Sequence, residues 1–227
     1  MKFQELLATV GERPCFSVRD LIVPKEEKHA LRVQLKRWCD AGKISRIRKG
    51  LYGINAPWCK TKAPLCILDL YHEIEYGSWV SGETALSHYG VIPDTAFQLS
   101  VYGVNVKPRR EYFDTDGLVS MIDFRRAPLG LSFGCQYVPF GRENTRYRLY
   151  AEPEKALLDC AYRFSYCCEP AWIEELRLDY LLLNKETLAN YAKRMNRRMI
   201  EFAHAVGLLI DEELTWERDN PNTWIEA

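Results

Sequence analysis

Apolar residues recur at helical spacing in the stretch from residue 25 to Gly42. Leu31, Leu35 and Trp38 are four and three positions apart, which places them on one face of a helix with a 3.6-residue period. The remaining positions of this stretch are largely basic or polar. Gly42 is expected to end the helix, because glycine tolerates the positive φ angle that often follows a last helical turn.

Apolar and basic residues then alternate loosely between Ile44 and Ile54. This alternation predicts two short strands joined at Lys49-Gly50, with Arg46, Arg48 and Lys49 making the tip of the hairpin positive. A basic helix followed by a basic hairpin is the layout of a winged helix-turn-helix, a module that reads DNA.

Two further helices are expected before this stretch. Residues 2–10 place Phe3, Leu6, Leu7 and Val10 on one face. A second helix is expected to start at Ser17, a good N-cap residue with an acid three positions later. The stretch from residue 56 to 64 is the best linker candidate because it is rich in proline and alanine. The predicted domains are therefore 1–58, a winged helix-turn-helix, and 59–227.

The second region mixes strand and helix patterns. A helix is expected around residues 65–75, and alternation around Leu99 predicts a half-buried strand. Short β-like runs follow near residues 119–124, 135–138 and 147–150, after which Pro153 fits the first turn of a helix. A last long helix is expected from Asn184 to a stop at Gly207. The predicted fold class is α+β, an N-terminal winged helix-turn-helix followed by a mixed α/β C-terminal domain ending in helices.

Charge is distributed unevenly, although the 227-residue chain has a formal net charge of zero. Residues 1–62 contain 14 Lys and Arg against 6 Asp and Glu, so the remaining residues are acidic by the same excess. Such a split indicates a basic binding domain and a second domain with another task. Chance segregation of surface charge is the alternative.

No targeting signal or membrane span is recognised in the sequence. The longest uncharged stretch, residues 127–141, is interrupted by proline and glycine, so it is not expected to cross a bilayer. None of the 8 cysteines forms a pair at the two-residue gap of a zinc ribbon or a redox motif. A reduced, cytoplasmic protein without metal or cofactor is therefore expected.

Three motifs follow one another along the chain: Arg48-Lys49-Gly50-Leu51-Tyr52, the segment from Ser81 to Gly90, and Tyr147-Arg148-Leu149 leading into residues 152–159. Together they resemble the ordered motifs of AbiEi-type antitoxins. The segment Arg48-Lys49-Gly50-Leu51-Tyr52 is similar to the end of their N-terminal domain. The segment from Ser81 to Gly90 resembles the opening of their second domain. The strand Tyr147-Arg148-Leu149 leading into residues 152–159, which read EPEKALLD, resembles their most recognisable motif. As an ordered set the three cover nearly the whole chain.

The resemblance implies a bacterial regulator encoded beside a nucleotidyltransferase-like toxin. It implies that the N-terminal domain binds inverted repeats in its own promoter and represses it. It also implies that the C-terminal domain neutralises the toxin, usually without a stable complex with it. Related regulators keep this architecture without a known toxin partner, so a winged-helix regulator of that kind is an alternative.

DNA contact is the chemistry that the residues support best. Lys and Arg neutralise phosphates and release counterions, and arginine is the commonest reader of guanine edges. Arg32 with His29 or Gln34 is predicted to read bases, while hairpin arginines reach a neighbouring groove or the backbone. The full set of predicted DNA contacts is Arg19, Lys25, Lys28, His29, Arg32, Gln34, Lys36, Arg46, Arg48 and Lys49. A solvated basic face, or a protein-binding winged helix, is the competing interpretation.

Two further basic clusters are possible auxiliary surfaces. They are Lys107, Arg109 and Arg110, and, on the expected last helix, Lys193, Arg194, Arg197 and Arg198. Most such clusters are simply the solvated side of an element. The functional alternative is a surface for nucleic acid or for a toxin.

Enzymatic activity is not expected from the sequence. Pro153 stands two positions before Lys155, where a metal-dependent nuclease would need an acid. Neither a phosphate-binding glycine motif nor a nucleophile elbow is present. Glu152, Glu154 and Asp159 are interpreted as charges at a helix start. A pure interaction protein that binds its toxin directly, and an enzyme that modifies the toxin, remain the competing hypotheses.

Overall fold

The structure, a computed structural model, describes residues 1–21, 24, 27–60, 65–94, 97–115, 118–140 and 146–219. Its contacts divide the chain into two compact units. The first unit comprises Met1–Gly77, Glu111–Ile122 and Phe140–Arg146, and the second comprises Ser78–Arg110, Asp123–Pro139 and Tyr147–Ala227. Both contain helices and strands, so the predicted mixture of α and β structure is confirmed. The domain boundary after residue 58 stays a prediction.

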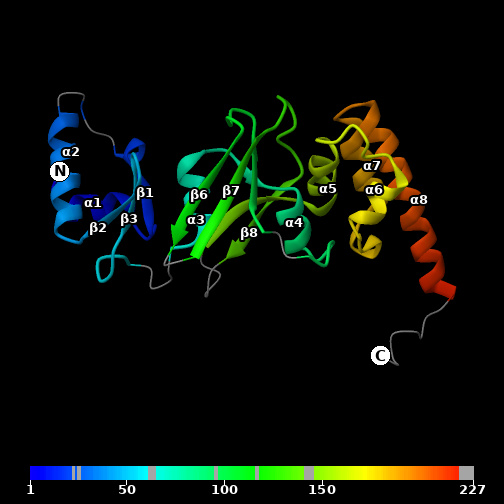
Figure 1. Cartoon of the computed structure of the whole chain (residues 1–227), viewed down its shortest axis with the longest axis horizontal. Helices are drawn as coiled ribbons and strands as arrows, with labels where there is room; N and C mark the ends of the chain where they lie inside the picture. Colours follow the sequence, from blue (N-terminus) through cyan, green and yellow to red (C-terminus); the bar gives the residue numbers. More distant parts are fainter. Residues whose placement is uncertain are drawn as a thin grey trace. The chain divides into compact units, whose positions relative to one another are not determined.

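The stretch Met1–Gly77 of the first unit folds into helices and a small antiparallel sheet (Figure 1). In chain order its elements are α1 (Phe3–Val10), β1 (Cys15–Ser17), the 3-10 turn η1 (Val18–Asp20), α2 (Lys28–Asp40), β2 (Ile44–Arg48), β3 (Leu51–Ile54) and α3 (Ile67–Ile74). The strands lie in the order β1-β3-β2. The predicted helix at residues 2–10 and the predicted hairpin are therefore confirmed, and β1 is added to the hairpin as a third strand.

The second helix predicted to start at Ser17 is wrong in type. Cys15–Ser17 pairs with β3 instead, with Phe16 opposite Tyr52, and only one 3-10 turn follows. Ser17 does cap that turn, because its Oγ accepts a hydrogen bond from the Arg19 amide at 3.3 Å. The connection between η1 and α2 includes residues outside the described ranges, so the helix-turn-helix itself stays a prediction.

One hydrophobic core joins α1, α2 and the three-stranded sheet. It is built from Phe3, Leu6, Val10, Phe16, Leu21, Leu31, Leu35, Trp38, Ile44 and Ile54. The rings of Phe3 and Trp38 lie 5.3 Å apart between centroids, so α1 and α2 meet through an aromatic contact. The three residues that predicted the buried face of α2 are all in this core.

A six-stranded sheet has the order β6-β7-β5-β4-β9-β8. Its strands are β4 (Trp79–Val80), β5 (Leu99–Gly103), β6 (Arg109–Thr115), β7 (Leu118–Arg126), β8 (Cys135–Phe140) and β9 (Arg146–Ala151). The strand predicted at Leu99 is confirmed as β5, but the expectation that it is half-buried is wrong, since all residues of β5 are buried. β5 is an inner strand of the sheet, and the hydroxyl of Thr84 accepts the Ser100 amide at 2.9 Å, which satisfies one buried polar group.

The second unit also contains helices. They are α4 (Glu83–His88), α5 (Pro153–Ala161), α6 (Pro170–Glu175), the turn η3 (Tyr180–Leu182), α7 (Lys185–Lys193) and α8 (Arg197–Asp219). Pro153 occupies the first turn of α5 as predicted. Within the described residues, no helix is both long and apolar enough to cross a membrane.

The single last helix predicted from Asn184 to Gly207 is wrong, because two helices occupy this stretch. Asn184 caps α7 as expected, but α7 ends at Lys193, and the side chain of Asn196 accepts the Met199 amide at 3.0 Å to begin α8. Gly207 lies inside α8. A Cβ at this position would lie 3.2 Å from Cε of Lys185, so glycine allows α7 and α8 to pack closely.

An ion pair is buried within the second unit. The ammonium group of Lys155 pairs with Asp159 one turn later on α5, and the two side chains are 0% and 4% exposed. Asp159 also accepts a hydrogen bond from Ser81 Oγ at 2.7 Å, and the Lys155 ammonium lies 5.6 Å from the Trp79 ring centroid. The interpretation of Asp159 as a helix-start charge is therefore wrong, whereas Glu152 and Glu154 do lie at the start of α5.

This ion pair generates a stability prediction. Asp159→Asn leaves the buried Lys155 charge uncompensated, so we expect the free energy of unfolding to fall by about 3–5 kcal/mol. The exposed pair of Lys185 and Asp211, whose side chains are 47% and 52% exposed, provides the matched control. Asp211→Asn should cost at most about 1 kcal/mol. Equal losses for the two variants in urea unfolding of the full chain would contradict this assignment.

Candidate nucleic-acid interface

The packing of α2 decides which of its basic side chains face outward. Leu31, Leu35 and Trp38 anchor one face in the core, and the helix ends in a Schellman motif. The Lys43 amide donates to the Trp38 carbonyl at 2.9 Å, and Gly42 has a φ of 67°. The stop predicted at Gly42 is confirmed, and α2 therefore presents a fixed stripe of polar residues to solvent.

The hairpin is held in place by η1. The Val18 amide donates to the Gly50 carbonyl at 2.8 Å, and Gly50 has a φ of 82°, a conformation that favours glycine. A register shift between Arg46 and Arg48 interrupts the pairing of β2 with β3. Such a bulge re-aims side chains. Arg46 is exposed, whereas Arg48 is half-buried and forms an ion pair with Glu111.

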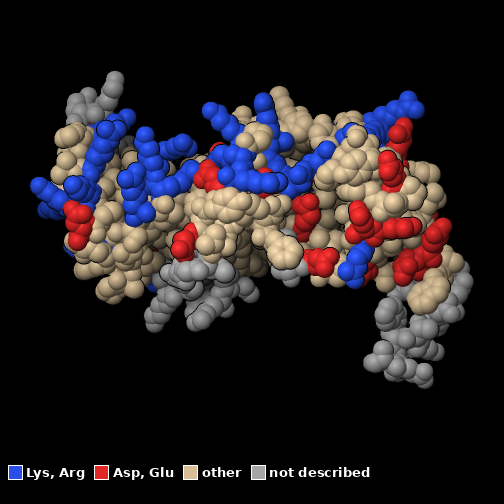
Figure 2. Space-filling view, viewed as in Figure 1, with Lys and Arg blue, Asp and Glu red and all other residues tan. Residues whose placement is uncertain are grey.

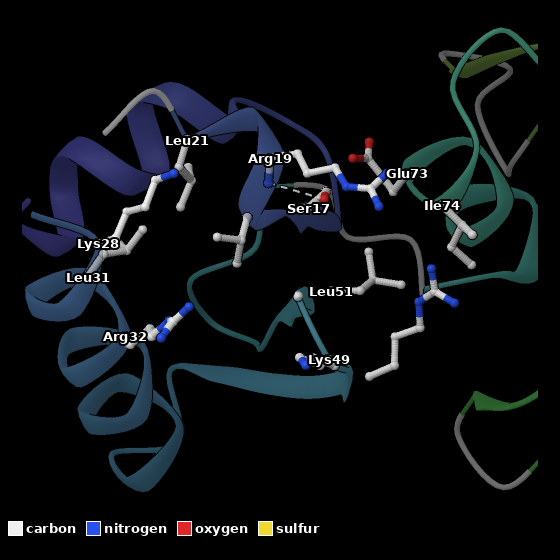
Figure 3. Close-up of a pocket in the computed structure, with 13 residues that line it drawn as sticks. Ser17, Arg19, Leu21, Lys28, Leu31, Arg32, Lys49, Leu51, Glu73 and Ile74 are labelled. Carbon is white, nitrogen blue, oxygen red and sulfur yellow. Dashed lines mark hydrogen bonds between the residues drawn. The ribbon is translucent and has the colours of Figure 1, made fainter. Parts of the chain in front are cut away.

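A pocket of about 300 Å³ lies where α2, η1 and the hairpin meet (Figure 3). It brings together five of the predicted DNA contacts, which are Arg19, Lys28, Arg32, Arg48 and Lys49. In the close-up, the Arg32 side chain extends from α2 toward the hairpin. Lys28, Arg32 and Lys49 are exposed, and within the described part of the chain they have no ion-pair partner. These cations are therefore accessible to an anionic ligand.

The other predicted contacts lie outside this pocket. His29 and Lys36 are exposed on α2, and Gln34 is half-buried. Gln34 follows Arg32 by two positions, about 200° around the helix axis, so these two side chains leave the helix on different sides. Lys25 lies outside the described residues. Figure 2 shows Lys and Arg side chains gathered over the N-terminal part of the chain on the face in view.

A carboxyl group near the pocket was missed by the sequence reasoning. Glu73 on α3 lines the pocket, and its Oε1 lies 3.2 Å from a guanidinium nitrogen of Arg13. The same nitrogen lies 3.0 Å from Asp20, and Tyr76 donates its hydroxyl hydrogen to Asp20. These residues are far apart in the sequence, and no local pattern connects them.

The two carboxyl groups of this network titrate differently. Burial, followed by the hydrogen bond with Asp20, raises the pKa of Glu73 to about 7. Burial also opposes ionisation of Asp20, but hydrogen bonds from Tyr76, Glu73 and the Ser17 amide, with the Arg13 charge, lower its pKa overall. Asp20 therefore holds the negative charge, and Glu73 is largely protonated below neutral pH. The protonated form reduces the negative charge beside the pocket.

The predicted auxiliary residues do not form one surface. Arg109 and Arg110 line a second pocket, in the second unit, and Lys107 is exposed. The residues predicted on one last helix are instead divided: Lys193 ends α7, Arg194 is its C-cap, and Arg197 and Arg198 begin α8. Arg194 lies 3.8 Å from the centroid of the Phe133 ring, and Arg198 donates to the Tyr162 carbonyl at 2.7 Å. Lys193 and Arg197 are exposed.

Comparison with known proteins does not assign the chain to a family. No protein-family model matches the chain, and no curated protein matches it. The resemblance to AbiEi-type antitoxins therefore stays a prediction from the three motifs.

The Glu73 network generates a pH prediction. Because its pKa is raised, the Glu73 contribution to stability is complete below the ordinary glutamate pKa and is lost as pH rises through about 7. Glu73→Gln keeps a neutral side chain at every pH. Between pH 5 and pH 8, we expect the unfolding free energy of the wild type to fall relative to the variant by on the order of 2 kcal/mol. Parallel profiles in urea titrations at these pH values would contradict the assignment.

Proposed function

We propose that this chain is a DNA-binding repressor of its own operon and the antitoxin of a bacterial toxin–antitoxin pair. The observation that carries the DNA-binding part is the convergence of five basic side chains from η1, α2 and the hairpin around one pocket. Three separate segments supply these cations, and a shared core fixes the segments relative to one another. Helical periodicity alone gives one basic stripe, whereas this arrangement gives a surface that a phosphate backbone can follow.

The role in DNA binding that we propose for each of these residues follows from its exposure. Exposed Lys28 and Lys49 contact phosphates, and exposed Arg32, which lines the same pocket, is the candidate to read a base. Arg48 is partly committed to Glu111, so it contributes positive potential more than a flexible contact. The apolar positions of the pocket, such as Leu31 and Leu51, hold the charged side chains at a fixed depth.

The antitoxin part rests on the motif resemblance. The motif from residue 152 to 159 forms the start of α5, and its Lys155 and Asp159 make the buried ion pair. In this proposal the motif keeps the second unit folded, and its partner is a nucleotidyltransferase-like toxin acting in the cytoplasm. Co-expression with the product of the adjacent gene tests this part, because an antitoxin restores growth that the toxin inhibits.

The DNA-binding proposal is tested with charge reversal at exposed positions. Arg32→Glu combined with Lys49→Glu should weaken binding to the protein's own promoter by at least about a hundredfold at moderate salt, because two cations become anions. The measurement is fluorescence anisotropy with a promoter duplex at fixed ionic strength.

The matched control is Arg37→Glu, on the same helix. Arg37 is exposed and lies five positions from Arg32, about 140° around the helix axis. This variant should bind within about threefold of the wild type, since it stays away from the pocket. If the control variant binds DNA as weakly as the double variant, or if the double variant keeps wild-type affinity, the DNA-binding interface does not lie at this pocket. Circular dichroism confirms that each variant is folded.

A further inference from the structure

A second pocket, of about 400 Å³, is lined by an unusual concentration of arginine. Its arginines are Arg109, Arg110, Arg125, Arg126 and Arg163. They come from β6, from β7 and from the segment after α5, and all belong to the second unit. Arg109 and Arg110 were predicted as auxiliary basic residues, whereas the other three carry no recognisable signal in the sequence.

Arg125 is the buried arginine of this pocket. Its side chain is 9% exposed, and Nη2 lies 2.8 Å from Asp123. Nη1 donates a hydrogen bond to the hydroxyl of Tyr102 at 2.8 Å and lies 3.3 Å from Glu83. A buried guanidinium held on three sides keeps its position without a ligand, so its charge is preorganised.

Two carboxylates connect this arginine to its neighbours. Asp123 lies 3.9 Å from the Nε of Arg110, and Glu83 lies 3.5 Å from a guanidinium nitrogen of Arg163. Burial opposes ionisation of Glu83, but the charges of Arg125 and Arg163 and a backbone hydrogen bond lower its pKa overall. Glu83 is therefore ionised, and the chain of alternating charges fixes the spacing of three guanidinium groups.

Positive charge remains in excess in this pocket. Asp159 also lines it, but Asp159 is matched by Lys155. Five arginines and two aspartates line the pocket, and Asp123 is the aspartate that remains. Arg110 is 61% exposed and Arg163 is 33% exposed, so two of the linked guanidinium groups are accessible. Guanidinium groups prefer phosphate, which they bind with paired N–H donors.

The shape and the apolar part of the pocket narrow the ligand class. Phosphates of a duplex lie on a convex surface and favour protruding cations, whereas a terminal phosphate enters a cavity that has a buried arginine. Leu131 and Tyr162 line the same pocket and provide apolar surface beside the charges. A volume of about 400 Å³ lies in the range of small-ligand sites.

We propose that this pocket binds a nucleoside polyphosphate. The phosphates bind Arg110 and Arg163 over the positive charge of Arg125, and the base packs on the wall that includes Leu131 and Tyr162. The site is separate from the proposed DNA-binding residues, all of which belong to the first unit. Nucleotide binding is therefore expected to survive loss of DNA binding.

The experiment is isothermal titration calorimetry of the full chain with ATP, GTP, CTP and UTP singly, and with pyrophosphate. At least one nucleotide should bind with a micromolar dissociation constant, and pyrophosphate should bind several-fold more weakly because it lacks a base. Arg110→Gln combined with Arg163→Gln should weaken nucleotide binding by at least about tenfold. Arg197→Gln is the control, because Arg197 is 93% exposed and lies outside the pocket. The Arg32→Glu, Lys49→Glu variant should bind nucleotide as the wild type does.

Three results would overturn the proposal. The first is no binding of any of the four nucleotides at millimolar concentration. The second is binding of pyrophosphate as tight as that of the best nucleotide, which would remove the role of the apolar wall. The third is displacement of bound nucleotide by a short DNA duplex in the Arg32→Glu, Lys49→Glu variant, which would reassign the pocket to nucleic acid. Thermal unfolding of the Arg110→Gln, Arg163→Gln variant shows whether lost binding reflects lost folding.

Discussion

Leu31, Leu35 and Trp38 are between 2% and 7% exposed, and their burial fixes the rotation of α2 about its axis. The direction in which the basic side chains of α2 point depends on that rotation. Burying three large apolar side chains is worth several kcal/mol, on the order of 2 kcal/mol for each, so the helix cannot turn to present another face. Lys28 and Arg32 are consequently held on the side of η1 and the hairpin.

Charge serves different purposes in the two units. In the first, four of the five cations around the pocket are exposed, whereas Arg48 is half-buried and paired with Glu111. In the second, several charged groups are buried and paired, as in Lys155 with Asp159 and Arg125 with Asp123. Buried pairs contribute little net stability but are costly to break, so they fix the positions of neighbouring groups. The arginine-lined pocket contains both kinds of charge, because the buried and paired Arg125 lies beside exposed arginines.

Local patterns predicted the elements whose signals are contained within a few turns of chain. The α2 helix, its stop at Gly42 and the following hairpin are of this kind. The helix expected at Ser17 failed because pairing with β3, distant in sequence, determines the strand at Cys15–Ser17. Gly207 was predicted to stop a helix, but it lies inside α8, where the absence of a side chain leaves room for Lys185 of α7. Likewise, the Glu73 network and the pairing of Arg125 with Glu83 join residues that no local spacing connects.

The central claim is that the cations around the first pocket bind DNA through its phosphates. Its most direct measurement is the affinity of the wild-type chain for its own promoter duplex as a function of salt. The two phosphate contacts proposed for Lys28 and Lys49 predict that the logarithm of the binding constant falls linearly with the logarithm of salt concentration, with a slope of about −2. A slope near zero, or no binding to the promoter at low salt, would contradict the account.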